Sequence, residues 1–598
     1  MTRFVNRLGH ILRTPHLVIG VSLIVALAYL VLMPFWEVIA TSFTAQRADV
    51  RRIEGAEVGS FTLYYWERML ASPLTQRGFL QPLYNTLTIS FLYTFLAMAI
   101  GVGLAWLTAR TDMAFRRAIP DLILVPYVIP SWGIALAWIT LFRSDTMPGH
   151  PAGVLQAFTG ITVPTWVVFG PFPIIIVLAI NYFAFTYLLA ASAFASLDAS
   201  LDDAARLHGA SRWRILRRIT LPITIPALGS AFILTFSQGL GTFGVPAFLG
   251  MPDRYFVLAT SLFFNINTGR MGDAFVLALF IIGLASVTIW INTLVLGRRR
   301  QFTTISGKDT RPALTPLGRW RVPIGLMTIG FLLLVAVVPL IVLVMQTLTW
   351  RVGNFSPEHW TLHFWIGREM LGAQFQDRLS GIFFNPEIMR AAWNSIKLGV
   401  IVGLVVAFVG QLAGYVVSRG RGGWIARALD QLTFLPFVIP SVVFGAIYLS
   451  MFAQPRGPIP ALYGTFALLV VVSVVKRLPF AARSGTSSMM QVSGELEEAA
   501  VMHKAGFFRI MRRILFPLTR NGIFVGFIFG FVNTVKDLAL VILLVTPLTN
   551  VLPALTYSYT ERGFRQYSDA VTVLIVAIVL IGTFLARRIS RTDFSRGF

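Results

Sequence analysis

The chain contains the stretch Asp203-Ala-Ala-Arg-Leu-His-Gly209, which continues through Ala-Ser-Arg-Trp-Arg-Ile-Leu-Arg-Arg to Ile219-Thr-Leu-Pro222. A second copy reads Glu498-Ala-Ala-Val-Met-His-Lys504, then Ala-Gly-Phe-Phe-Arg-Ile-Met-Arg-Arg, then Ile514-Leu-Phe-Pro517. The acidic start suits the positive end of a helix dipole, and a glycine turns cheaply with positive φ. Proline then begins the next helix, where no amide donor is needed. Each copy therefore predicts a short helix, a turn and a basic stretch that leads into a longer helix.

The sequence around both copies has the composition of a membrane protein. Of its 598 residues, 56% are hydrophobic and 13% are charged, whereas a soluble protein carries about 25% charged residues. A span needs about 20 mainly apolar residues to cross about 30 Å of hydrocarbon. Twelve spans are predicted, near 17–43, 84–109, 120–142, 163–194, 223–250, 272–296, 322–348, 393–418, 430–453, 459–480, 520–546 and 569–587.

Charge gives the orientation of these spans. The net charge is +24, and the basic residues gather in the loops that hold the two motifs and next to both termini. By the positive-inside rule that side is the cytoplasm, so both termini are expected there. No exposed basic domain remains for nucleic acid. The chain has no cysteine, which excludes disulfides, thiolate metal sites and cysteine nucleophiles.

The two halves are repeats of one unit. The segment Leu124-Val-Pro-Tyr-Val-Ile-Pro-Ser131 returns as Leu435-Pro-Phe-Val-Ile-Pro-Ser441, and Asn85 matches Asn394. The offset is 436 − 126 = 310 at the first shared proline and 517 − 222 = 295 at the second, so the first half holds about 15 extra residues. We place them at 144–160, on the outer side.

Both repeats thus run in the same orientation, related by an axis along the membrane normal. The predicted division is a first repeat over 1–296 with its loop at 198–222, a cytoplasmic linker over 297–321, and a second repeat over 322–598 with its loop at 493–517.

The two loops resemble the signature of the membrane permeases of bacterial ABC-type importers: Glu-Ala-Ala, three residues, Gly, nine residues, Ile, one residue, Leu-Pro. The first copy matches every fixed position, with Asp203 in place of glutamate. The second has Lys504 where glycine is expected and Phe516 where leucine is expected, and Gly506 is the nearest glycine that could make the turn. The positive-inside rule alone would explain the basic charge of these loops, but not the acidic-Ala-Ala opening or its fixed distance to proline.

The resemblance implies an all-α integral membrane protein, with two repeats of the type I ABC importer permease kind, in the bacterial inner membrane. Each loop would form a coupling helix seated in a groove of a separate ATPase subunit, with two such subunits and a periplasmic solute-binding protein as partners. ATP and Mg would bind to the ATPase and no cofactor to this chain, which has no Gly-x-x-x-x-Gly-Lys-Ser/Thr loop. The expected docking residues are Asp203, Ala204, Ala205, Gly209, Glu498, Ala499, Ala500 and Lys504.

Polar residues within the predicted spans are candidates for the translocation path, because charge inside a membrane is costly. These candidates are Gln238, Thr242, Asn533, Lys536 and Asp537. The alternative is structural: Lys536 and Asp537 would neutralise one another or pair with neighbouring helices. As adjacent residues they point to different sides of a helix, so at least one of them needs a further partner. The paired prolines 126/130 and 436/440 predict breaks in the third and ninth spans.

The arrangement looks most like permeases for ferric iron, with thiamine, polyamine and phosphonate permeases as relatives. A second class, the ion-coupled secondary transporter, would also show repeats and charges within the membrane. An enzyme is not supported, because the seven histidines are scattered and no His-Glu-x-x-His spacing occurs.

Overall fold

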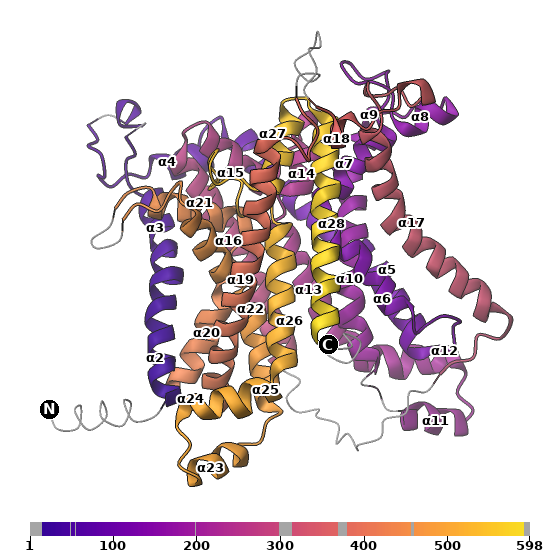
Figure 1. Cartoon of the computed structure of the whole chain (residues 1–598), viewed down its shortest axis with the longest axis vertical. Helices are drawn as coiled ribbons and strands as arrows, with labels where there is room; N and C mark the ends of the chain where they lie inside the picture. The colour runs from indigo at the N-terminus through magenta and orange to yellow at the C-terminus, as the bar shows by residue number, and fades with distance from the viewer. Residues whose placement is uncertain are drawn as a thin grey trace.

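A computed structural model of the chain describes residues 15–590, apart from 48, 54, 196, 198, 298–313, 369–378 and 456–459. The described residues form a bundle of long helices with short helices at both ends (Figure 1). Most of the predicted linker 297–321, together with the first and last residues of the chain, lies outside this described part.

The long helices follow the predicted spans in chain order. Those of the first repeat are α2 (Pro15–Leu27) continued by α3 (Met33–Ser42), α5 (Gln81–Arg110), α6 (Ile119–Val128), α7 (Ser131–Phe142), α10 (Pro171–Ala195), α13 (Leu221–Leu240) and α16 (Met271–Gly297). Those of the second are α17 (Arg321–Thr347), α19 (Pro386–Arg419), α20 (Trp424–Val438), α21 (Ser441–Phe452), α22 (Phe466–Met490), α26 (Arg520–Val535) and α28 (Arg565–Ser590). The all-helical class is confirmed.

The number of spans depends on how bent helices are counted. In the described part, eight helices are long and apolar enough to cross a membrane, or up to eleven if each bent pair is one span. The predicted span that this count leaves out is the tenth, near 459–480, which corresponds to α22; its Lys476, Arg477 and Arg483 make it more polar than the others. Because α22 packs between α19 and α26, protein rather than lipid surrounds much of it.

Two predicted spans end earlier than expected. The fifth was predicted to reach 250 but α13 stops at Leu240, where a glycine-rich segment follows and disfavours helix. The eleventh was predicted to reach 546 but α26 stops at Val535, and turns follow. The apolar side chains after it, Leu540 and Leu544 among them, are buried in protein. An apolar run therefore marks burial here and not membrane crossing.

The predicted breaks at the paired prolines are observed. The axes of α6 and α7 differ by 81°, and those of α20 and α21 by 105°. In the second repeat Lys476 Nζ donates to the carbonyls of Ile439 and, at 3.0 Å, of Pro436. In the first, Asn181 Nδ2 donates to the carbonyl of Ile129 at 3.2 Å. These carbonyls are thus covered by polar side chains, as helix breaks within a membrane protein require.

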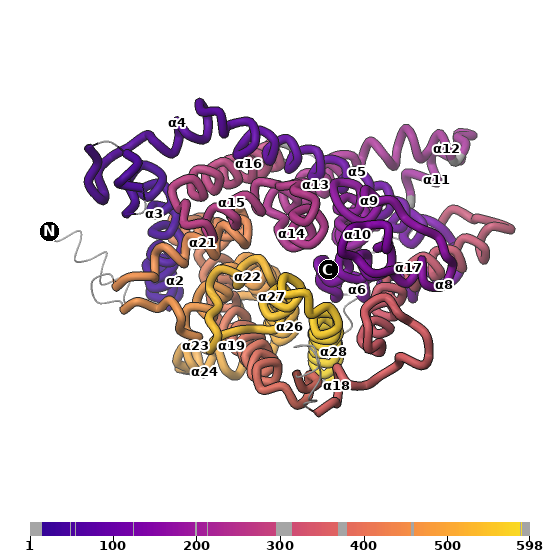
Figure 2. The backbone as a smooth tube through the Cα atoms, turned by 90° about the horizontal axis from the view of Figure 1, so that it is seen from above, coloured from indigo at the N-terminus to yellow at the C-terminus, as the bar shows by residue number. Residues whose placement is uncertain are grey.

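The first helix of each repeat packs against the other repeat (Figure 2). Helix α2 lies against α19 and α20, and Tyr448 Oη donates to the carbonyl of Leu30 at 2.5 Å. Helix α17 lies against α6 and α7, and Arg143 Nη2 donates to Gln346 Oε1 at 2.5 Å. This exchange ties the two repeats together along both flanks.

Matched asparagines hold matched loops in the two repeats. Asn85 Nδ2 donates to the carbonyl of Phe256 at 2.8 Å, just before α15 (Leu258–Asn267). Asn394 Nδ2 donates to the carbonyl of Asn550 at 3.0 Å, just before α27 (Leu552–Glu561). The predicted insertion near 144–160 contains α8 (Val154–Thr159), which lies at the end of the bundle opposite the two motif loops (Figure 1).

Candidate functional site

Two short helices protrude from the same end of the bundle, one from each repeat (Figure 1). They are α11 (Ala199–Leu207) and α23 (Glu495–Met502). Each begins with acidic residues in its first turn, which favours the positive end of the helix dipole. Helix α2 begins and α28 ends at this same end of the bundle (Figure 1). The two motif copies thus form the predicted short helices.

Both helices end in the same way. Gly209 and Lys504 have φ of 72° and 57°, in the left-handed region. In the first copy the amide of Ala210 donates to the carbonyl of Ala205 at 3.0 Å. In the second the amide of Ala505 donates to the carbonyl of Ala500, also at 3.0 Å. This is the Schellman arrangement, which closes a helix through a left-handed residue.

The expectation that Gly506 could make the turn in the second copy is wrong. Gly506 has φ −70° and ψ 159° and precedes α24 (Phe507–Ile510). Lys504 itself takes the left-handed conformation, which costs a residue with a Cβ about 1–2 kcal/mol. The hydrogen bonds that close the helix offset this cost, so the lysine in place of glycine leaves the shape of the turn unchanged.

An ion pair fastens each protruding helix to the bundle. Arg110, the last residue of α5, pairs with Asp202, and both side chains are buried, with 3% and 7% exposed. Arg419, the last residue of α19, donates from Nε to Glu497 Oε1 at 2.6 Å. The pairs are equivalent by sequence, since 419 − 110 = 309 and 497 − 202 = 295 are the offsets of the repeat.

These pairs were not predicted. The arginines look like any others in basic loops, and each acid stands directly before the motif's own Asp203 or Glu498. The matched spacing of acid and arginine in both repeats was the available signal.

The outward faces of the two helices are solvent-exposed. Asp203, Ala204, Glu498 and Ala499 are exposed, whereas Ala205 and Ala500 are half-buried. Apolar side chains stand beside them: 88% of Leu207 and 83% of Met502 are exposed. Exposed apolar side chains grouped with small residues outside the membrane are typical of a protein-binding surface.

The charged candidates of the eleventh span lie at the end of α26 and not inside it, because the helix stops at Val535. Asp537 pairs with Arg477 of α22, and Arg477 Nη2 also donates to the carbonyl of Asn533 at 2.8 Å. Lys536 Nζ donates to the carbonyl of Tyr127 at 2.7 Å and lies 4.1 Å from the centre of that ring. Lys536 and Asp537 thus pair with neighbouring elements, and Lys536 crosses between the repeats.

The first-repeat candidates lie at an equivalent place but join no such cluster. Gln238 is in the last turn of α13 and Thr242 follows it, both half-buried. In the described part of the chain, no hydrogen bond links either of them to the second-repeat residues. Lys476 and Arg477 were missed, although two adjacent charges within a predicted span were a visible signal. Nor do three His, Asp or Glu side chains come together as a metal site among the described residues.

A duplicated bundle of membrane helices, with two matched short helices protruding from one end, has the architecture of a transport permease. Comparison with known proteins agrees: residues 75–301 and 399–592 match the family described as "Binding-protein-dependent transport system inner membrane component". The match covers more than half of the chain, once in each repeat. The chain belongs to this family.

The relatives are permeases with different cargo in their names. The chain is 24% identical to a ferric transport system permease protein of Actinobacillus pleuropneumoniae, over 80% of this chain and 67% of the relative. It is 25% identical to a putative ferric transport system permease of Haemophilus influenzae, over 82% and 74%. It is 30% identical to a probable molybdenum ABC transporter permease of Haloferax volcanii, over 38% and 80%.

Proposed function

We propose that this permease imports ferric iron across the inner membrane, with energy from separate ATPase subunits docked on α11 and α23. The observation that carries the proposal is the pair of equivalent docking helices, each closed by the same turn and each fastened by an arginine–carboxylate pair. Two equivalent surfaces suit two copies of one ATPase, which would bind the ATP and Mg. The basic loops and both termini would then lie in the cytoplasm.

Through the ion pairs, a movement of the docking helices would be passed on to the two repeats. Each pair connects a protruding helix to the end of a long helix, α5 or α19, that runs through its own repeat. When ATP draws the two ATPase subunits together, α11 and α23 would approach one another and move the two repeats around the path between them. ATP changes this equilibrium only through its different affinity for the two states.

Ferric iron is the first candidate for the cargo because the relatives that share most of the chain's length are named for it. Thiamine, polyamine and phosphonate remain alternatives, and another relative is named for molybdenum. A separate periplasmic binding protein would deliver the cargo and make most of the choice. Uptake of radioactive iron by vesicles that contain this permease, its ATPase and a periplasmic binding protein loaded with ferric iron would test the assignment.

Docking is tested with Leu207→Glu and Met502→Glu together, since both side chains are almost fully exposed and a change there leaves the fold intact. We expect co-purification with the ATPase to be lost. Val58→Glu, 59% exposed in a loop near the opposite end, is the matched control. Full transport and unchanged co-purification in the double variant would refute the docking role. Uptake driven by an ion gradient without nucleotide would instead favour a secondary transporter.

A further inference from the structure

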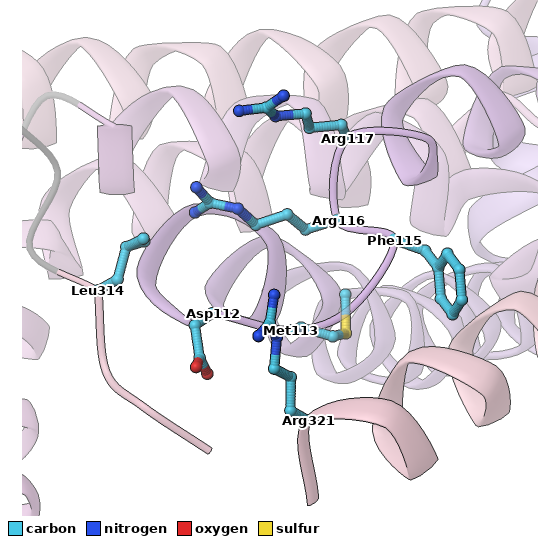
Figure 3. A pocket seen from close by; sticks show the side chains of 7 residues that line it. All are labelled: Asp112, Met113, Phe115, Arg116, Arg117, Leu314 and Arg321. Atoms are coloured by element: carbon cyan, nitrogen blue, oxygen red, sulfur yellow. The ribbon is translucent and has the colours of Figure 1, made fainter. Parts of the chain in front are cut away.

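A pocket of about 330 Å³ lies between the first repeat and the segment that leads into α17 (Figure 3), and α17 starts at the end of the bundle from which α11 and α23 protrude (Figure 1). One wall is the loop that follows α5, and the other is the segment that leads into α17. The backbones of these segments are joined: the amide of Asp112 donates to the carbonyl of Thr315 at 3.2 Å, and that of Ala114 to the carbonyl of Arg321 at 3.1 Å. These backbone hydrogen bonds hold the two walls of the pocket together.

Three arginines and one carboxylate line it. Arg116 and Arg117 extend from the loop, and Arg321 rises toward them from the start of α17 (Figure 3). The carboxylate is already engaged, since Asp112 Oδ1 accepts a hydrogen bond from the amide of Leu317 at 2.7 Å. The side chains of Arg117 and Arg321 make no hydrogen bond or ion pair with another described residue. The pocket thus presents an excess of positive charge with free guanidinium donors, which suit a phosphate group.

The surroundings of the pocket are those of a membrane boundary. Along α17, directly after Arg321, Val322 and Leu326 are 49% and 56% exposed. Trp320, just before it, is 55% exposed, and tryptophan is enriched where headgroups meet hydrocarbon. A headgroup in the pocket would leave its acyl chains beside the apolar face of α17. The linker 298–313 is a poor occupant by charge, because it carries five basic residues and one acid.

We propose that this pocket binds a phosphate group, presented by an anionic phospholipid of the leaflet on that side of the membrane. The site has a direct connection to the docking machinery. The carbonyl of Arg110 accepts a hydrogen bond from the amide of Thr315 at 2.8 Å, while the Arg110 side chain pairs with Asp202. A bound headgroup would hold the loop and the start of α17 together directly behind the first docking helix.

The experiment measures lipid bound to the purified full-length chain by native mass spectrometry, with phosphatidylglycerol and phosphatidylcholine offered in equal amounts. The test variant is Arg117→Gln/Arg321→Gln, which removes two exposed side chains. The control is Arg512→Gln/Arg513→Gln, which removes two exposed arginines at the same end of the second repeat. Each basic residue near an anionic lipid surface adds to the affinity for that lipid, and the test variant loses two of them. We therefore expect it to bind phosphatidylglycerol about 30-fold more weakly. The control should bind like wild type.

A second arm adds inorganic phosphate to lipid-depleted protein and follows the thermal unfolding midpoint. If the phosphate group belongs to a lipid, phosphatidylglycerol should raise the unfolding midpoint and millimolar phosphate should not. This stabilisation should be absent in the test variant. Stabilisation by phosphate alone would overturn the lipid as source. Equal affinity for the two lipids, or equal losses in test and control variants, would overturn the site itself.

Discussion

The ion pair between Arg110 and Asp202 gives the most direct test of how the docking helix is held. Replacing Arg110 with glutamine keeps a side chain of similar length but removes its charge. Because the carboxylate then stays buried, with only 7% of its side chain exposed, the loss is that of a broken buried pair, about 3–5 kcal/mol. The equivalent Arg419→Gln is expected to cost less, about 1–2 kcal/mol, because its pair is nearly a fifth exposed.

The damage should be local. Helix α11 protrudes from the bundle and has little other packing, since most of its side chains are exposed. Loss of the pair should therefore free the helix while the bundle stays folded. Amide hydrogen exchange measured by mass spectrometry on peptides covering 199–210 would show this. A loss of about 3 kcal/mol corresponds to exchange faster by about two orders of magnitude, while peptides from α10 should exchange as before.

A charge reversal provides the control. Arg110→Asp with Asp202→Arg restores a pair of opposite charges, and it should recover part of the protection that either single change removes. Two results would refute the reasoning. One is unchanged exchange over 199–210 in Arg110→Gln. The other is equal loss of protection in α10, which would mean that the pair stabilises the whole bundle and not the position of the docking helix.

Further predictions concern the turn, the helix break and a histidine. Lys504→Gly should raise the free energy of unfolding of the α23 loop by about 1 kcal/mol, seen as slower amide exchange over 495–505, because glycine takes φ 57° without a Cβ clash. Lys476→Met should lower the stability of the chain by about 1–3 kcal/mol, because the carbonyl of Ile439 loses its donor. Lys476→Asn, which copies Asn181 at the matched position, should recover part of that loss, and no recovery would argue against the carbonyl as the cause. Burial lowers the pKa of His150 below its ordinary value of 6.5, and the charges of Arg565 and Arg143 lower it further. The unfolded chain then binds more protons, so stability should fall as the pH drops from about 7.5 to about 5.5, and His150→Gln should show a smaller fall in its unfolding midpoint.

The sequence predicted the parts of the fold that depend on a local pattern. Apolar runs of about 20 residues indicated the long helices, and the two motif copies indicated the short protruding helices with their acidic starts. The paired prolines indicated the two breaks, since a missing amide interrupts a helix wherever it occurs. The boundary errors at Leu240 and Val535 share one cause. Hydrophobicity records burial, and it does not distinguish lipid from the interior of a protein.

The partners of the charged residues could not be predicted from the sequence, because each pair joins elements that only the fold brings together. Asp537 and Arg477 are 60 residues apart, and Lys536 meets Tyr127 across the two repeats. Comparison of matched positions in the two repeats, however, gives information that one repeat alone does not. Asn181 and Lys476 differ in type but occupy equivalent positions, and both cover the carbonyl that precedes the second proline of a break. Where two repeats use different side chains for one structural task, as here, a charge within the membrane does not by itself identify a cargo site. The proposal that α11 and α23 dock a partner rests on the opposite observation: their exposed faces satisfy no internal need of the fold.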